Sequence, residues 1–490
     1  MYINSQFFQR NQILRSILTL VFFISLLVIF FLPLADNDFG WHYRCGMQIM
    51  QSRGVCQGGE FLYFLSDYQW ANPNFLYDIF IANVFNHFGF LGLSFLGSLI
   101  LTLVIIWIYK SSPAGIFIKI PLIYLAIFLS WPVLSLGFRS QILSLLFGAL
   151  TFYFLGAKKE SHLKKIIWLV PLFGVWANTH PSFFLGPLIF ALYLIGQWLG
   201  FLRKKVLLKT VAITSIVFCL SSIATLLNPF GYYIYEEVYR HWQMPLSTLI
   251  AEWVPPLLWP SVIIIVLTGI FIIYNVLKNK FDFFATAVLL IAAFFSLKAR
   301  RNLPFFYFYY LYLVLKNLNF KINEKWGRYF EYFLTGAIMI GLIFWAPRKI
   351  QRTFQFDTDF SQYCSAGYVQ YPCRATAFLK KFAAENRRSL NIFNTYEWGG
   401  FLVWQLPEHK IFIDGRMPAW FGEAGQSPYT TWLKIIQASI DWDKKLTAYG
   451  TDCLFIGPGT FLDLLLQEQA ERFGYRAIYR DDLAAIWLKS

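Results

Sequence analysis

Charged residues are scarce in this chain of 490 residues, because Asp, Glu, Lys and Arg together make up only 14%. A soluble domain carries about a quarter charged residues, so this scarcity excludes a soluble enzyme and a disordered scaffold. In place of charge the sequence has 57% hydrophobic and 20% aromatic residues, and its mean hydropathy is +0.50. The composition predicts a polytopic membrane protein.

Nucleotide and zinc signatures are also lacking. The C-terminal part contains no P-loop and no G-x-G-x-x-G string, and the Cys and His residues have no zinc-site spacing. The net charge of +15 would suggest nucleic acid in a soluble protein. In a membrane protein the same excess is expected of cytoplasmic loops, so we expect no nucleic-acid partner.

The charge distribution divides the chain into two predicted domains. Up to Pro347 there are 25 basic and 12 acidic residues, and from Arg348 onward there are 17 and 15. The first part has long apolar runs that approach the ~20 residues needed to cross hydrocarbon, whereas the last part has soluble composition. We therefore expect a transmembrane domain over 1–346, with a first outer loop at about 35–75, and an α/β domain over 347–490.

The apolar runs predict about eleven transmembrane helices. They fall at about 17–34, 88–109, 120–136, 141–157, 166–178, 183–200, 210–227, 260–277, 283–297, 303–315 and 329–346. With the N-terminus in the cytoplasm, 18 of the 25 basic residues of this part are cytoplasmic and 7 are outside. Because Lys and Arg are enriched in cytoplasmic loops, this asymmetry predicts the orientation, and an odd helix number places the C-terminal domain outside.

Ionisable and amide side chains collect in the predicted outer segments. Such groups are costly at membrane depth and usually mark function, although a single one can simply cap a helix end. They occur in six strings: Asp36, Asp38, His42 and Arg44 in LADNDFGWHYRCG; Arg139 and Gln141 in GFRSQ; Asn178 and His180 in WANTHPS; Asn228 in NPFGYY; Glu252 in AEWVPP; and Lys298, Arg300, Arg301 and Asn302 in KARRN. Their gathering on one side predicts a polar cavity open to the outside.

The first outer loop opens with Asp36 and Asp38. One carboxylate at a partly buried site can act as a general base, while the other holds an acceptor or a metal; either can instead cap a following helix. The pair is compatible with a divalent cation or with none. The residues around His42 to Gly46 predict a short interfacial helix, with Trp41 and Trp70 at headgroup depth.

A first helix, an outer loop that opens with acidic residues and contains an interfacial helix, and many further helices together resemble the GT-C glycosyltransferase superfamily. That superfamily includes the protein O-mannosyltransferases and the lipid A aminoarabinose transferase. The strings DNDFGWHYRCG, FRSQ, WANTHPSF, NPFG, EW, ARRN and WGGFLVW…IFIDGR also resemble a group of bacterial membrane proteins. The resemblance implies a multi-pass protein of the bacterial plasma (inner) membrane.

The resemblance also implies a reaction. Members use polyprenyl-phosphate-linked sugars, and an acidic residue of the first outer loop activates the acceptor, which is a lipid, a glycan or a protein. Asp38, or alternatively Asp36, is then the catalytic residue; the family's Asp-Glu pair appears here as Asp36-Asn37-Asp38, so the choice stays open.

The departing lipid phosphate is an anion, so cationic side chains are expected to bind it. Arg suits phosphate through its planar fork, so Arg139, Arg300 and Arg301, with Lys298, are candidates to bind it, unless they are outward cations without a ligand. The supporting candidates are His42, Arg44, His180, Asn178 and Glu252. His180 can orient a ligand or be a structural hydrogen-bonding group, and Glu252 can be a second acid or a cap.

Short apolar strands alternate with helices after about Leu390, which predicts a small α/β layer. Four Cys form close pairs in outward segments, Cys45 with Cys56 and Cys364 with Cys373, and an oxidising exterior favours disulfides there. Cys219 and Cys453 are expected to stay unpaired.

Three other functions were weighed against a glycosyltransferase. An O-antigen polymerase or ligase lacks this acidic first loop and has its large outer loop between late helices. A transporter predicts two related halves with broken helices, and the sequence shows no such repeat. A non-enzymatic envelope assembly protein remains an alternative.

Overall fold

The computed structural model describes residues 1–490 except 1, 53, 157–158, 280, 318–323 and 366–368. Arg53, Lys158, Lys280 and Lys321, which contribute to the predicted charge asymmetry, lie outside the described residues. The chain forms two compact units. Unit 1 consists of Met1–Leu34, Phe90–Leu227 and Ala251–Gln355, and unit 2 of Ala35–Gly89, Asn228–Ile250 and Phe356–Ser490.

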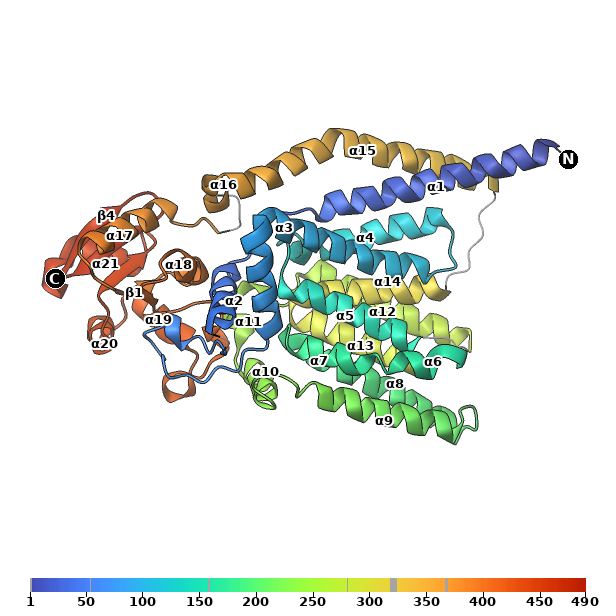
Figure 1. Cartoon of the computed structure of the whole chain (residues 1–490), viewed down its shortest axis with the longest axis horizontal. Coiled ribbons are helices and arrows are strands. Elements are labelled where there is room, and N and C mark those ends of the chain that lie inside the picture. Colours follow the sequence, from blue (N-terminus) through green and yellow to red (C-terminus); the bar gives the residue numbers. More distant parts are fainter. Residues whose placement is uncertain (1, 53, 157–158, 280, 318–323, 366–368) are drawn as a thin grey trace. The chain divides into compact units, whose positions relative to one another are not determined.

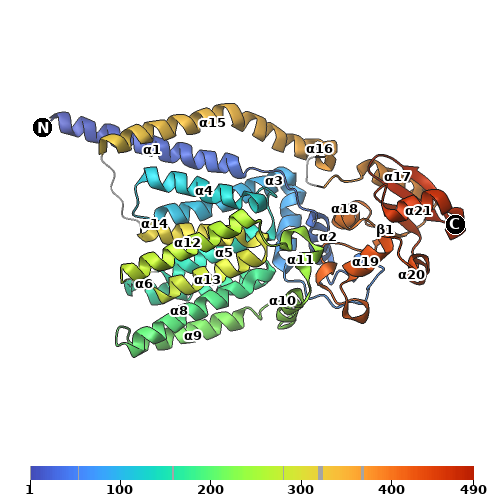
Figure 2. The same ribbon diagram turned by 180° about the vertical axis from the view of Figure 1, so that it is seen from behind.

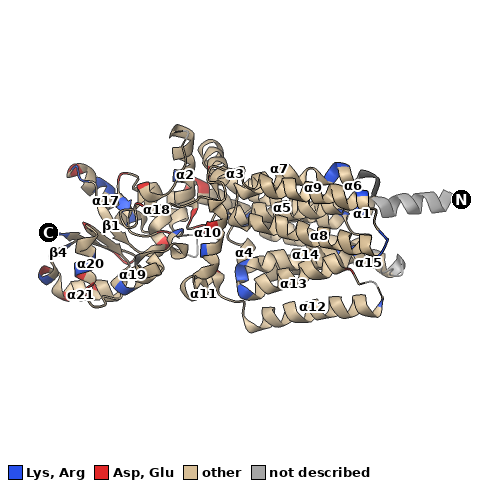
Figure 3. Cartoon of the chain, turned by 90° about the horizontal axis from the view of Figure 1, so that it is seen from below, with Lys and Arg blue, Asp and Glu red and all other residues tan. Residues whose placement is uncertain are grey.

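Unit 1 is a helical bundle, which Figures 1 and 2 show from opposite directions. Its helices are α1 (Tyr2–Phe30), the later part of α3 (Phe75–Lys110), α4 (Ile116–Leu134), α5 (Ser140–Leu155), α6 (Lys159–Ile166), α7 (Leu169–Ala177), α8 (Leu185–Leu202), α9 (Leu208–Ala224), α12 (Leu258–Leu277), α13 (Phe283–Lys298), α14 (Leu303–Asn317) and most of α15 (Glu324–Thr358). Figure 3 shows Lys and Arg at the helix ends, with almost no charge between them. Such apolar middles suit a hydrocarbon environment.

Each of the eleven predicted apolar runs overlaps one of these helices. Six helices of the described residues are long and apolar enough to cross a membrane, and three shorter apolar ones are α5, α9 and α13. At 1.5 Å per residue, the nine residues of α7 extend only about 14 Å, well short of a ~30 Å hydrocarbon core. The predicted fold class, a helical polytopic membrane protein with a small C-terminal α/β domain, is confirmed, whereas the count of eleven spans stays a prediction.

Gly89 divides α3 between the two units. Its φ of 60° and ψ of −158° interrupt the helical backbone, a conformation that favours glycine. A Cβ added there would lie 2.4 Å from Asp357 Oδ1. The predicted apolar run begins at residue 88, so it matches only the part of α3 in unit 1.

The core of unit 2 is a five-stranded sheet with the order β2-β1-β3-β5-β4. Its strands are β1 (Asn391–Asn394), β2 (Lys410–Ile411), β3 (Cys453–Ile456), β4 (Tyr475–Arg480) and β5 (Ala485–Lys489). Strands β2, β1 and β3 are parallel, and β5 and β4 are antiparallel additions. All four residues of the central β3 are buried, because neighbouring elements cover both of its faces. The predicted α/β layer is confirmed.

Nine complete α-helices of the described residues, and the first part of α3, accompany this sheet in unit 2. The nine are α2 (Phe39–Ser52), α10 (Tyr233–Gln243), α11 (Leu246–Leu249), α16 (Phe360–Ser365), α17 (Cys373–Glu385), α18 (Gly399–Gln405), α19 (Pro428–Ile436), α20 (Trp442–Ala448) and α21 (Phe461–Gln469). The helix predicted around His42 to Gly46 is α2.

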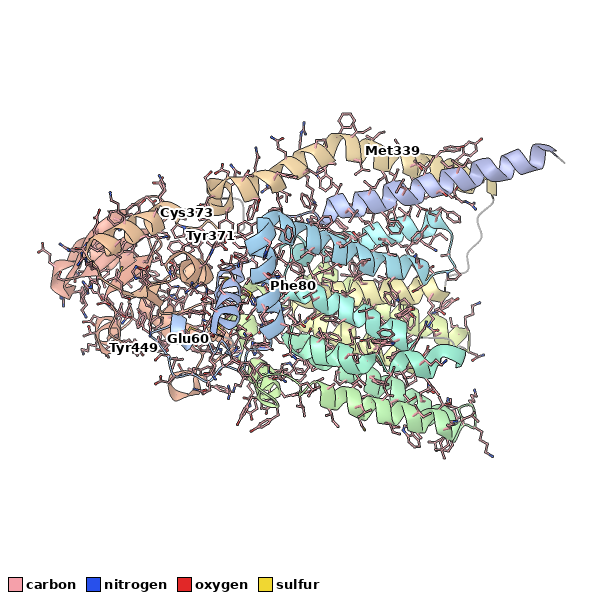
Figure 4. All side chains as sticks on the ribbon, in the orientation of Figure 1. Glu60, Phe80, Met339, Tyr371, Cys373 and Tyr449 are labelled. Carbon is pink, nitrogen blue, oxygen red and sulfur yellow. A yellow bond between two sulfur atoms is a disulfide. The ribbon has the colours of Figure 1, made fainter. Side chains whose placement is uncertain are left out.

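Both predicted disulfides are present. Cys45 in α2 bonds to Cys56, and Cys364 in α16 bonds to Cys373, which begins α17 next to Tyr371 (Figure 4). Cys219 and Cys453 are free, as expected. The two bridges close short loops, and each restricts the unfolded chain locally.

Candidate functional site

Three of the strings singled out in the sequence pack against one another in unit 2. A Cβ on Gly40 of DNDFGW would lie 1.9 Å from the Gly400 carbonyl oxygen, and one on Gly400 of WGGF would lie 2.1 Å from the Asn37 carbonyl oxygen. A Cβ on Gly399 would lie 2.3 Å from the Ile413 carbonyl oxygen, at the start of IDGR. Glycine is required at these positions because backbone contacts backbone. The first loop and the C-terminal sheet domain therefore share one packed core.

Asp36 and Asp38 differ in their surroundings. Asp36 is 5% exposed, and its Oδ1 accepts a hydrogen bond from the Asp38 backbone N–H at 3.2 Å. Asp38 is half-buried, and its Oδ1 accepts from Trp41 Nε1 at 3.0 Å. Asp38 lies at the start of α2, where the helix dipole stabilises a carboxylate. The partly exposed Asp38 is thus better placed to receive a proton from a ligand.

The loop after β2 lies directly against Asp38. A Cβ on Gly415 would be 1.9 Å from Asp38 Oδ1, so only glycine lets this backbone approach the carboxylate. On either side of Gly415, Arg416 Nε donates to both oxygens of Asp414, at 2.9 and 3.1 Å, and the whole pair is buried. A paired, hydrogen-bonded buried charge of this kind fixes a loop conformation.

Aromatic rings surround the Arg416 guanidinium. Its central carbon lies 5.2–5.7 Å from the ring centroids of Trp70, Trp41, Phe61 and Trp420. Trp41 and Trp70 are each 4% exposed, so they pack inside unit 2 around a cation rather than facing lipid headgroups. Arg44 lies over Phe61 at 6.0 Å, and burial lowers the pKa of its guanidinium.

His42 belongs to a buried polar network that the sequence analysis missed. His42 Nδ1 lies 2.5 Å from Asp78 Oδ1, and Asn72 Nδ2 donates to Asp78 Oδ2 at 2.7 Å. The His42 ring also stacks on Trp41, with centroids 3.5 Å apart. Asp78 fixes the orientation and tautomer of His42 next to the Asp38 loop. A carboxylate at the start of an apolar run, as in NPNFLYD, was the signal that could have found it.

A second missed cluster lies on α10. Arg240 Nη1 donates to Glu237 Oε2 at 3.3 Å and to Tyr68 Oη at 3.0 Å, and the Tyr68 ring stacks on Trp420 at 4.3 Å. Burial raises the pKa of Glu237 to about 7, although Arg240 opposes the shift. Burial likewise raises the pKa of Tyr68 to about 12.

Unit 1 gathers the predicted cations around one carboxylate. Arg139 Nη1 lies 2.5 Å from Glu252 Oε1, and Arg300 and Arg301 also interact electrostatically with Glu252. Gln141 Nε2 donates to the Arg301 carbonyl oxygen at 2.6 Å. Lys298 instead lies over the Phe294 ring at 5.9 Å. Three arginines beside one glutamate leave an excess of positive charge at this end of unit 1, which suits an anion.

The two other candidates of unit 1 make internal hydrogen bonds. His180 Nδ1 lies 3.0 Å from Ser144 Oγ and accepts from the Ser182 backbone N–H at 3.1 Å. Asn178 Nδ2 donates to the carbonyl oxygens of Gly174 and Leu227, at 2.8 and 2.9 Å. These bonds fix the turn between α7 and α8. Neither residue is among the groups that surround Glu252 in the described contacts.

The described residues contain no group of three or more His, Cys, Asp or Glu side chains arranged to hold a metal ion. The described residues thus contain two candidate clusters, one in each unit. The first, the acidic cluster, is Asp36, Asp38, His42, Asp78, Asp414 and Arg416 in unit 2. The second, the arginine cluster, is Arg139, Glu252, Arg300 and Arg301 in unit 1.

Comparison with known proteins gives a likeness of fold. No family model matches the chain, and no curated protein matches it. The oligosaccharyltransferase AglB from Archaeoglobus fulgidus, in complex with an inhibitory peptide and a dolichol-phosphate, superposes with a TM-score of 0.58 at 11% identity, over 95% of this chain and 71% of that one. The same enzyme tethered to an acceptor peptide gives 0.55 at 11% identity, over 97% and 74%. ArnT from Cupriavidus metallidurans bound to undecaprenyl phosphate gives 0.49 at 12% identity, over 98% of both chains.

At 11% identity these superpositions show the fold alone. AglB is a GT-C membrane glycosyltransferase. Its superposition on this chain has a TM-score above 0.5 and covers nearly the whole of this chain. The GT-C-like fold that the sequence predicts is therefore confirmed, with the helical bundle and the C-terminal α/β layer both part of it.

Proposed function

We propose that this protein is a membrane glycosyltransferase that moves a sugar from a polyprenyl-phosphate-linked donor to an acceptor on the outer side of the membrane. The observation that carries the proposal is the half-buried Asp38 at the start of α2, fixed by Trp41 and by the Gly415 backbone. Its place in a GT-C-like fold supports a role in acceptor activation. One AglB structure of that fold contains a peptide and a dolichol-phosphate, which are the two kinds of ligand that the proposed reaction needs.

In the proposed reaction, Asp38 accepts the proton of an acceptor hydroxyl or amide as that group attacks the anomeric carbon of the sugar. The new bond joins the acceptor atom to the sugar, and the bond between the anomeric carbon and the phosphate oxygen breaks. The leaving group is the polyprenyl phosphate, which carries away the electron pair. Proton removal by a positioned base contributes about 10²–10⁴ to the rate of such a step.

The arginine cluster is proposed to receive the departing phosphate. Arg139, Arg300 and Arg301 outnumber Glu252, and an arginine fork donates two parallel hydrogen bonds to a phosphate. Lys298 adds a point charge from the end of α13. Electrostatic stabilisation of a developing anion is a large term in many enzymes.

His42 and Arg416 are proposed as supporting groups for Asp38. The Asp78 and Asn72 side chains hold His42 in one orientation, and Asp414 holds Arg416. Preorganised groups of this kind need no rearrangement when the reaction begins. Asp36, which accepts from the Asp38 backbone N–H, is proposed to shape the turn that presents Asp38.

The experiment that tests the proposal compares cells that carry the gene with cells in which it is deleted. Mass spectrometry of surface glycans and of extracted polyprenyl-phosphate sugars should show one glycan lost and one lipid-linked sugar accumulated in the deletion. If neither pool changes while an envelope assembly defect appears, the non-enzymatic alternative is favoured. A change in glycan chain length alone would favour a polymerase.

A further inference from the structure

A cavity of about 520 Å³ lies within unit 1, where α5, α8 and α14 end and α13 begins. Aromatic residues line part of it, among them Phe152, Tyr193, Tyr309 and Tyr312. Gly196 and Gly200, one turn apart on α8, also line it. The lining thus combines aromatic with polar and charged side chains, and the volume suits part of an amphiphilic molecule.

This cavity is distinct from the arginine cluster. Arg139 directly precedes α5, whereas Leu155 and Gly156 at the other end of α5 line the cavity. The 16 residues of α5 extend about 24 Å at 1.5 Å per residue. Helix α14 also separates the two sites. Arg301 of the arginine cluster lies just before its start, and Lys316, which lines the cavity, lies in its last turn. The two sites thus occupy opposite ends of the bundle.

The rim of the cavity is basic. Arg203, Lys205 and Lys316 line it together with a single carboxylate, Asp282. Asp282 Oδ1 already accepts a hydrogen bond from the Ala285 backbone N–H at 3.1 Å, where it caps α13. The three cations are exposed at this end of the helices. A rim with this positive excess favours an anion, and Arg and Lys both bind phosphate through charge-assisted hydrogen bonds.

One residue that lines the cavity has a buried hydroxyl group without a partner among the described residues. Tyr309 is 6% exposed, and its Oη makes no hydrogen bond with the described residues. Its ring is held by Phe152, with centroids 4.6 Å apart. Tyr309 precedes Lys316 by two turns of α14, about 10 Å along the axis. A buried hydroxyl without a partner is unfavourable, so a ligand that accepts from it would gain affinity.

We propose that this cavity binds an anionic glycerophospholipid. Its phosphate lies among Arg203, Lys205 and Lys316, an ester oxygen accepts a hydrogen bond from Tyr309 Oη, and the acyl chain runs along Phe152 and Tyr193. A free phosphate would contact the rim alone, and it would satisfy neither the Tyr309 hydroxyl nor the aromatic part of the lining. The site does not depend on the proposed transferase activity. The topology prediction places this end of the bundle at the cytoplasmic leaflet.

Native mass spectrometry of the detergent-solubilised full chain tests the proposal, with dioctanoyl phosphatidic acid as the probe. We expect the triple variant Arg203→Gln, Lys205→Gln, Lys316→Gln to bind the probe at least about tenfold more weakly, because it loses charge-assisted hydrogen bonds. The matched control is Lys204→Gln, Lys209→Gln, Lys278→Gln, which removes three cations that do not line the cavity. That control should bind like the wild type.

A second pair of variants tests the hydroxyl group. Tyr309→Phe should weaken binding of the probe about threefold to tenfold. Tyr307→Phe is its control, because Tyr307 lies on the same helix, is 2% exposed and has an Oη without a partner among the described residues, yet does not line the cavity. Equal loss in both members of either pair would overturn the assignment of this cavity.

Competition identifies the source of the phosphate. Inorganic phosphate at millimolar concentration should leave the bound phosphatidic acid in place, and dioctanoyl phosphatidylcholine should bind more weakly than phosphatidic acid because its headgroup is neutral overall. Displacement by inorganic phosphate alone would contradict a lipid ligand. Melting temperatures of all variants, measured in the same detergent, exclude unfolding as the cause of lost binding.

Discussion

Asp36 and Asp38 are only two residues apart, yet the fold gives them different surroundings. Asp36 is buried and its carboxylate accepts a hydrogen bond from the backbone of the turn, while Asp38 is half-buried at the start of α2. A general base needs access to the acceptor as well as a fixed position, and of the two only Asp38 combines partial exposure with a fixed geometry. Asp36 contacts the Asp38 backbone N–H, so we propose that it shapes the turn that presents Asp38.

Asp38→Asn should therefore abolish nearly all function in cells. The amide keeps the size of the side chain but cannot accept the acceptor proton, so we expect a loss of about 10²–10⁴ in the formation of the surface glycan. Asp67→Asn, an exposed substitution in the same loop, is the matched control and should be neutral. Complementation of a deletion strain, read by glycan mass spectrometry, measures both. Wild-type glycan levels in Asp38→Asn would remove Asp38 from the mechanism.

Glu237 makes the stability of unit 2 depend on pH. Its pKa is raised from 4.5 to about 7, mainly by burial and against the effect of Arg240. Because the folded protein binds this proton more tightly than the unfolded chain does, the contribution to stability is complete below pH 4.5. It is lost as the pH rises through about 7. We expect the melting temperature to fall between pH 5 and pH 8, and to fall less in Glu237→Gln.

Neighbouring groups must be controlled in that measurement. His241 Nδ1 lies 3.9 Å from Glu237, Glu236 pairs with Arg240 at 3.7 Å, and Tyr68 accepts from Arg240. The Glu237→Gln variant and the protein with which it is compared should therefore both carry His241→Gln. Glu236→Gln, on the exposed side of α10, serves as the matched control substitution. Parallel pH profiles for Glu237→Gln and its reference would show that Glu237 does not titrate in this range.

Residues that lie close in the sequence could be predicted, whereas partners from distant segments could not. Both disulfides were predicted correctly because each joins cysteines that are close in the sequence, whereas the roles proposed for Asp36, Asp38 and the arginines of KARRN stay predictions. Asp78 lies 36 residues from His42, and Arg416 lies 358 residues from the Gly58 that it contacts. No periodicity connects such positions. Glu237 was missed because nothing in the sequence showed that α10 is buried on that side.

At the scale of elements, hydrophobic runs predicted the helices well. Each predicted run overlaps a helix, and the short strands predicted after about Leu390 correspond to the sheet of β1 to β5. Glycine residues account for a helix break and for close backbone contacts that the hydrophobic runs did not predict. Gly89 ends one part of α3, and Gly40, Gly399 and Gly400 let α2, α18 and the loop after β2 touch through their backbones. These contacts depend on the fold as a whole rather than on local propensity.

The segment Arg300–Asn302 between α13 and α14 allows a test of donor binding. Arg300→Ala and Arg301→Ala should each lower transfer at limiting donor, because the phosphate loses charge-assisted partners worth about 1.5–3 kcal/mol. More donor should partly restore the rate of these variants and leave Asp38→Asn inactive. Lys278→Ala, at the other end of the bundle, serves as the control. Arginine variants that resist rescue by donor would contradict the assigned role.

At the scale of the whole molecule, the charge asymmetry predicts the topology. Basic residues are concentrated in one set of loops of unit 1, while unit 2 holds the disulfides Cys45–Cys56 and Cys364–Cys373 that an oxidising exterior favours. The compact units cut across the sequence, because unit 2 combines the first loop and α10 with the C-terminal sheet. The predicted division into a transmembrane domain over 1–346 and an outer domain over 347–490 stays a prediction.

Reporter fusions test that topology. A periplasm-active phosphatase fused after Ser490 should be active, and the same phosphatase inserted in the 316–328 loop should be inactive, because basic loops are retained in the cytoplasm. A cytoplasm-active reporter at the same two positions provides the reciprocal control. Activity of the cytoplasmic reporter after Ser490 would mean that the disulfide-bonded unit 2 faces a reducing compartment, and the proposed outer reaction would fail.

Transfer by the purified protein tests the central claim most directly. The reconstituted full chain is incubated with a lipid extract from deletion cells and a cell-wall acceptor fraction, and released polyprenyl phosphate is quantified by mass spectrometry. We expect the wild-type protein to release polyprenyl phosphate in step with sugar appearing on the acceptor, and the double variant Asp36→Asn, Asp38→Asn to release essentially none while remaining folded. Equal release by the double variant and the wild type would contradict the account.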